Sequence, residues 1–186
     1  MALIAIKGKP GLFFDTVSQK TLNIIEWRED DKWDTGAFAD GAMSLNASLN
    51  FFRDLTNKEK IDCNLGTARK IKAGEEMRIE RVGVQIPSAI GNLTPPPADI
   101  KKLADNGYLL FQINSKDVAE GPLVKFPSGY GLSGQTVENA QGVVGIGTPA
   151  TAAAAKLARE QFVNNDSELD ATITYYRRKW MDSDNL

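Results

Sequence analysis

The chain contains no histidine, and this absence limits the chemistry that its side chains offer. Without histidine, Ser-His-Asp and Cys-His nucleophilic sites, histidine-ligated metals and the commonest general base near neutral pH are excluded. Glu75 and Glu76 are adjacent, so on an extended strand they point to opposite faces and do not form a catalytic carboxylate pair. We therefore expect no enzyme activity and no catalytic residues.

Metal and disulfide chemistry are also poorly supported. Cys63 is the single cysteine, so an intrachain disulfide is excluded and the usual four-ligand structural zinc site has no ligand set. Asp30, Asp31 and Asp34 lack the spacing of a calcium-binding loop. We expect no metal and no other cofactor.

Residues 129–134 match the dinucleotide-binding pattern G-x-G-x-x-G. A functional copy of this pattern closes a strand, opens a helix and is followed by an acid about 20 residues later. Here Pro127 and Ser128 precede it, residues 135–147 show no helical pattern, and Ala154 stands at the position of the acid. The pattern therefore indicates a surface loop.

A basic run with neighbouring aromatic residues lies near the C-terminus. Its members are Arg177, Arg178 and Lys179, flanked by Tyr175, Tyr176 and Trp180. Such a group can contact nucleic acid, but strand alternation would place its members on opposite faces. The formal net charge of −2, from 22 basic and 24 acidic residues, supplies no general attraction to nucleic acid. A charged subunit contact or a solvated strand end is the better interpretation.

The composition is that of a folded protein. The chain has 186 residues, of which 42% are hydrophobic and 25% charged, and this length predicts one domain over residues 1–186. No stretch approaches the roughly 18 apolar residues of a membrane span. The N-terminus lacks the basic region and the long apolar region of a signal peptide, so we expect a soluble protein.

Alternation of apolar and polar residues predicts several strands. It is clearest over residues 41–53 and returns over residues 169–176. Residues 12–17 and 21–27 predict a hairpin with a short loop around Gln19. Residues 2–6 predict either an edge strand or part of an N-terminal arm, residues 1–11, that reaches a neighbour.

The middle of the chain predicts a strand, a helix and further strands. In residues 75–86 the apolar positions change face between Ile79 and Val82, which predicts a bulge near residues 80–83. Residues 108–114 are apolar at both parities, which predicts a central strand covered on both faces. Residues 118–126 predict its antiparallel partner, placed at an edge or bulge by Pro122.

Two helices are expected. Residues 94–107 combine prolines at the start, an apolar stripe and the stop signal Asn106-Gly107. Residues 149–163 follow a capping Thr148 and are rich in alanine, which favours a helix with a face suited to a subunit contact.

Three short motifs lie within residues 45–135: Asp62-Cys63-Asn64-Leu65 matches D-x-N-L, Gly121-Pro122-Leu123 matches G-P-L, and Phe126-Pro127-Ser128-Gly129 matches F-P-x-G. On these motifs, residues 45–135 resemble bacteriophage capsid proteins of the jelly-roll type. The resemblance implies an antiparallel β-sandwich of about eight strands, self-association and a role as a shell building block without catalysis.

The sequence thus predicts a mainly β, jelly-roll-like antiparallel β-sandwich with two short helices. The expected function is that of a structural virion protein, made in the host cytoplasm, which contacts copies of itself and other capsid proteins. No small-molecule substrate is expected. The alternative is a carbohydrate-binding β-sandwich in which Trp27, Trp33 and Tyr130 form a stacking platform.

The expected subunit contacts come from five segments. These are the N-terminal run, the tryptophan-containing loop, the glycine-rich loop at 129–147, the alanine-rich helix and the basic C-terminal run. The candidate residues are Leu3, Ile4, Ile6, Trp27, Trp33, Tyr130, Leu157, Phe162, Arg177 and Arg178.

Overall fold

The computed structural model describes residues 3–16, 19–23, 30–38, 45–86, 97–128 and 154–176. Its contacts divide the chain into two compact units, Met1–Trp33 and Asp34–Leu186. The expectation of one domain over residues 1–186 stays a prediction.

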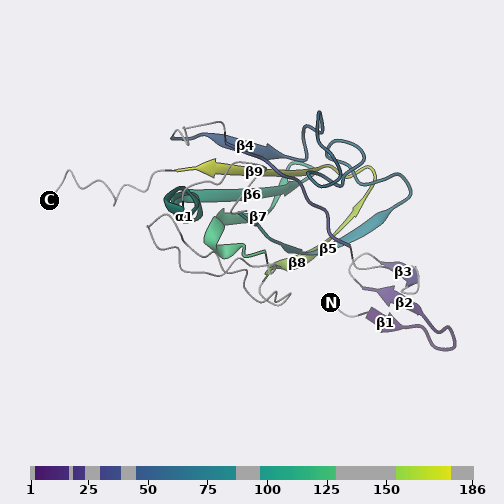
Figure 1. Cartoon of the computed structure of the whole chain (residues 1–186). Coiled ribbons are helices and arrows are strands. Elements are labelled where there is room, and N and C mark those ends of the chain that lie inside the picture. The colour runs from purple at the N-terminus through teal and green to yellow at the C-terminus, as the bar shows by residue number, and fades with distance from the viewer. Residues whose placement is uncertain are drawn as a thin grey trace. The chain divides into compact units, whose positions relative to one another are not determined.

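The first unit is a three-stranded antiparallel sheet in the order β1, β2, β3 (Figure 1). The strands are β1 (Leu3–Ala5), β2 (Leu12–Asp15) and β3 (Lys20–Asn23). The predicted hairpin is confirmed by the pairing of β2 with β3. The N-terminal run is an edge strand, because β1 pairs with β2 alone.

The turn between β1 and β2 depends on glycine. Gly8 and Gly11 both have a φ of 80°, a conformation that side chains other than glycine rarely adopt. The Ile6 N–H donates to the Leu12 carbonyl at 3.1 Å, so the antiparallel ladder continues one step beyond β1. This step places Ile6 opposite Leu12.

The second unit contains a four-stranded antiparallel sheet in the order β4, β9, β6, β7 (Figure 1). The strands are β4 (Ser48–Phe51), β9 (Leu169–Tyr175), β6 (Gly107–Ile113) and β7 (Lys116–Pro122). The last strand is confirmed, as are the central position of β6 and the edge position of β7. Of residues 41–53, only the β4 residues are in a strand, and residues 41–44 lie outside the described part.

The expectation that β6 is covered on both faces is wrong. Leu109, Phe111 and Ile113 are buried, whereas Tyr108 and Leu110, on the other face, remain half-exposed. Among the described residues, one face of this sheet lies against the core and the other is less buried.

The strands β5 (Glu76–Val82) and β8 (Ala155–Asn164) form a separate antiparallel pair. The predicted irregularity is confirmed, because the register shifts between Ile79 and Arg81. Ile79 and Arg81 are two residues apart along β5, whereas their partners, Gln161 and Lys156, are five residues apart along β8. The additional residues therefore lie on β8. The change of face in β5 is thus matched by a bulge in β8.

The predicted helix over residues 149–163 is wrong where the structure describes it. Residues 155–163 lie in β8, and Leu157 and Val163 are buried at 7% and 3% exposure. Helix propensity is a weak preference of a few tenths of a kcal/mol per residue, and pairing with β5 and burial of these side chains override it.

The other predicted helix is confirmed as α1 (Pro97–Asn106), and a short 3₁₀ helix, η2 (Leu123–Lys125), follows β7. The helix ends at Asn106, and β6 begins at the next residue. A Cβ atom on Gly107 would lie 2.6 Å from the Leu103 carbonyl oxygen and 2.8 Å from Leu123 Cγ. Only glycine therefore fits where the helix passes directly into the sheet.

One hydrophobic core connects the elements of the second unit. The four-stranded sheet contributes its buried face, β5 and β8 contribute Ile79, Leu157 and Val163, and the connecting segments contribute Cys63 and other side chains. Nine strands, all paired antiparallel, are present among the described residues. The prediction of a mainly β, antiparallel fold is confirmed.

Candidate subunit-contact surface

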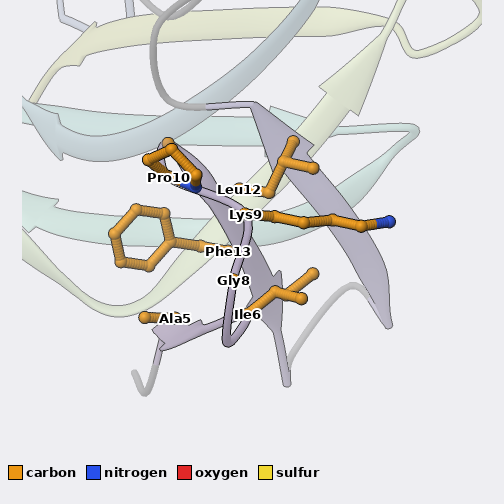
Figure 2. Close-up of a pocket in the computed structure, with 8 residues that line it drawn as sticks. Ala5, Ile6, Gly8, Lys9, Pro10, Leu12 and Phe13 are labelled. Atoms are coloured by element: carbon orange, nitrogen blue, oxygen red, sulfur yellow. The ribbon is translucent and has the colours of Figure 1, made fainter.

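The two sides of the first unit's sheet differ in burial. Strand pairing places Ile4 beside Phe14, and Ile6 beside Leu12, on one side. Figure 2 shows Ile6 and Leu12 directed to this side, while Ala5 and Phe13 point to the other. We call the side formed by Ile4, Ile6, Leu12 and Phe14 the open face.

The opposite side carries Asp15, which is fully buried, and Leu22, at 6% exposure, whereas Ala5 and Lys20 on that side are exposed. On the open face, by contrast, Ile4 is 55% exposed, and Ile6, Leu12 and Phe14 are half-buried. The open face therefore carries four large apolar side chains, of which Ile4 is the most exposed.

A hollow of about 410 Å³ adjoins the turn between β1 and β2. It is lined by Ala5, Ile6, Gly8, Lys9, Pro10, Gly11, Leu12 and Phe13 (Figure 2). The lining is largely apolar, with the Lys9 side chain extending from the turn.

The structure places two of the three candidates of the N-terminal run on one face of the sheet. Ile4 and Ile6 belong to the open face, and Leu3 stands opposite Asp15 in the register of β1 and β2. Trp33, at the end of the first unit, is 43% exposed. The candidates Trp27, Tyr130, Arg177 and Arg178 lie outside the described residues.

The two candidates from the alanine-rich segment need correction. They were expected on the surface of a helix, but both belong to β8. Leu157 is buried in the core, so it is not available for a partner. Phe162 is half-buried and stands opposite Arg78 of β5.

Sequence reasoning missed Leu12 and Phe14 as members of the open face. Their signal was present, because Ile4 and Ile6 are two residues apart, as are Leu12 and Phe14, so each pair lies on one side of its own strand. Only the register of β1 against β2 shows that both pairs lie on the same side of the sheet.

In the second unit, a buried ion pair anchors the segment that begins at Asp34. The Asp34 carboxylate is inaccessible to solvent and pairs with the Lys58 ammonium. It also accepts hydrogen bonds from the Thr35 N–H, at 2.9 Å, and from the Phe52 N–H. These contacts join three separate segments, which is a structural role.

Cys63 lies beside this ion pair and is buried. Burial raises the pKa of the Cys63 thiol, and the negative charge of Asp34 acts in the same direction. A thiol with a raised pKa is a poor nucleophile at neutral pH. Cys63 is therefore a core residue.

The raised pKa of Cys63 predicts a pH dependence of stability. Above the unfolded-state pKa of about 8.5, the unfolded chain loses the thiol proton while the folded chain retains it, so stability falls as pH rises through this range. The expected slope is up to about 1.4 kcal/mol per pH unit steeper in the natural protein than in Cys63→Ala. Urea unfolding between pH 8 and pH 10 measures both slopes, and equal slopes would contradict the prediction.

A second ionic cluster centres on Asp170. The Arg53 Nε donates to both carboxylate oxygens of Asp170, at 2.8 and 2.9 Å, and Arg69 Nη2 donates at 2.7 Å. The hydrogen bond to Asp170 raises the pKa of Arg53 despite partial desolvation. Arg69 also pairs with Glu168 at 3.1 Å. This cluster joins the end of β4 to the start of β9.

The half-exposed face of the four-stranded sheet has polar cross-strand pairs. Ser48 is hydrogen bonded to Thr174 at 2.9 Å, and Thr172 donates to Asn50 at 3.1 Å. The rings of Tyr108 and Tyr176 meet edge to face, with centroids 6.0 Å apart. Desolvation, followed by the Glu120 carboxylate, raises the pKa of Tyr108. The polar side chains of Ser48, Asn50, Thr172 and Thr174 therefore satisfy hydrogen bonds within this face.

Among the described residues, no group of three or more His, Cys, Asp or Glu side chains is arranged to hold a metal ion. No helix in the described part of the chain is long and apolar enough to cross a membrane.

No family model, curated protein or solved structure matches this chain.

Proposed function

We propose that the chain is a structural virion protein, a capsid building block that associates with copies of itself and with other shell proteins. The mainly β, antiparallel fold supports this proposal, because it agrees with what the resemblance to jelly-roll capsid proteins implies. The role requires surfaces for contact and no catalytic group. Assembly into virions follows synthesis in the host cytoplasm.

The observation that carries the proposal is the incompleteness of the first unit. It spans Met1–Trp33, and units below about 40 residues usually need a disulfide, a metal or association with a partner. It contains no cysteine, and Leu22 is the one hydrophobic side chain buried among its described residues. Packing of its open face against a partner removes further apolar surface from water, which stabilises the unit.

Light scattering of the full-length protein over a range of concentrations, combined with negative-stain imaging, tests the proposal. We expect discrete oligomers or closed particles whose population grows with concentration, because association buries the open face. Variation of the salt concentration is a useful control, since an apolar contact persists at high salt whereas exposed ion pairs weaken. A strict monomer at high concentration that binds glycans would contradict the proposal and favour the carbohydrate-binding alternative.

A further inference from the structure

The junction between α1 and β6 contains the single Asn-Gly pair of the sequence, Asn106-Gly107. Asparagine followed by glycine is especially prone to lose its side-chain amide, because glycine has no side chain to keep its nitrogen away from the asparagine. We infer that Asn106 is a modification site that the fold protects. It converts to aspartate or isoaspartate when this junction opens, and the product disfavours the folded state.

The reaction needs only groups of the chain and water. The Gly107 backbone nitrogen attacks Cγ of Asn106, so that an N–Cγ bond forms and the Cγ–Nδ2 bond breaks. The amide nitrogen leaves as ammonia with the Gly107 amide proton, and a cyclic succinimide remains. Water then opens the ring. Cleavage of the N–Cγ bond gives aspartate, whereas cleavage at the main-chain carbonyl gives isoaspartate, whose backbone contains an additional carbon atom.

The folded structure restrains both groups of Asn106 that must move for the ring to close. Asn106 is 8% exposed, and its side-chain amide donates to the Lys102 carbonyl at 3.0 Å. Its main-chain carbonyl accepts from the Tyr176 N–H at 2.9 Å, which ties it to the end of β9. Ring closure therefore requires these hydrogen bonds to break. Burial of Gly107 also limits access of the water that opens the ring.

The same surroundings disfavour the product. Asn106 Oδ1 is buried and has no hydrogen-bond partner among the described residues, so a charged carboxylate there would lack a donor as well as water. The charge would also stand at the C-terminal end of α1, where the helix dipole repels anions. In isoaspartate the additional carbon would lie beside Gly107, where an added Cβ already comes within 2.6 Å of the Leu103 carbonyl oxygen.

Incubation of the full-length protein at pH 8, in buffer and in guanidinium chloride above its unfolding midpoint, tests the inference. Peptide mapping by mass spectrometry, with chromatographic separation of aspartate from isoaspartate, follows Asn106 in both samples. We expect conversion to be at least about tenfold slower in the folded protein, because only molecules with an open junction react. Equal rates in the two samples, or no conversion in either, would overturn the inference.

Asn114 is the matched control within the same samples. Asn114 and Ser115 form the turn between β6 and β7, and both are exposed in the folded protein. The Asn114 Oδ1 accepts one hydrogen bond, from the Glu168 N–H at 2.7 Å, so unfolding should accelerate its conversion much less than that of Asn106. Equal acceleration at the two sites would show that the α1–β6 junction gives no special protection.

The variant Asn106→Asp reproduces the aspartate product directly. Its urea-unfolding midpoint at pH 7 should lie clearly below that of the natural protein, whereas Asn114→Asp, which keeps an acceptor at an exposed turn, should shift it little. In the natural protein, the yield of refolding after dilution from denaturant should fall as the converted fraction of Asn106 rises. An unchanged midpoint in Asn106→Asp, or full refolding of the modified protein, would overturn the inference. The proposed function stands or falls separately, because all these measurements concern one chain.

Discussion

Replacement of Gly107 by alanine is expected to lower the free energy of unfolding by about 2–3 kcal/mol. The added Cβ would lie 2.6 Å from the Leu103 carbonyl oxygen and 2.8 Å from Leu123 Cγ, closer than carbon atoms approach without displacement. The first neighbour is backbone of α1, so relief requires the helix to move away from β6. Urea unfolding followed by circular dichroism measures the loss.

Gly66→Ala is the matched control for this substitution. A Cβ atom on Gly66 would meet no atom within 4 Å, and its surroundings are exposed. We expect its free energy of unfolding to stay within about 0.5 kcal/mol of the natural protein. If the two alanine variants were equally stable, the close packing of α1, η2 and β6 around Gly107 would be wrong.

The variant Asp170→Asn is expected to lose about 2–3 kcal/mol of stability. Asp170 is buried, with 3% exposure, and its carboxylate accepts hydrogen bonds from both Arg53 and Arg69. Asparagine keeps the shape but removes the charge, and its amide hydrogens would face guanidinium donors. The arginine side chains are 45% and 35% exposed, so they can turn to water, which keeps the loss below the 3–5 kcal/mol of a fully buried pair.

Asp117→Asn makes the same chemical change at a solvent-exposed site. Asp117 accepts one hydrogen bond from Gln112, at 2.7 Å, and no large loss is expected because water replaces this contact. Urea unfolding of both variants measures the difference. Equal losses would show that the Asp170 cluster adds nothing beyond an ordinary surface hydrogen bond.

Strands were predictable wherever the local pattern and the final burial agree. Leu169, Ala171 and Ile173 alternate with Asp170 and polar residues, and these three are the apolar side chains buried in β9. The stop signal at Asn106 and Gly107 was equally local, because a glycine that follows the last helical residue needs no distant partner to be informative.

The alanine-rich segment failed for the opposite reason. Its residues individually prefer a helix, but the energy that decides its conformation comes from β5, which lies about 80 residues earlier in the chain and pairs with it. A pattern confined to residues 155–163 carries no information on that pairing.

Asp170 shows the same limit at the level of one side chain. Its place in the alternation predicts an exposed residue, yet Arg53 and Arg69 cover it. The backbone at Arg69 accounts for this, because its carbonyl accepts from the Leu169 N–H at 2.7 Å and holds the guanidinium beside β9.

By itself, the sequence determined that the chain has no histidine chemistry, and it predicted a mainly β fold. These properties follow from residue type and from periods of two or four residues. The tertiary structure decided which strands pair, which side of the first unit is open, and which charges are buried. Each of these depends on contacts between residues distant in the chain, whose free energy no local pattern contains.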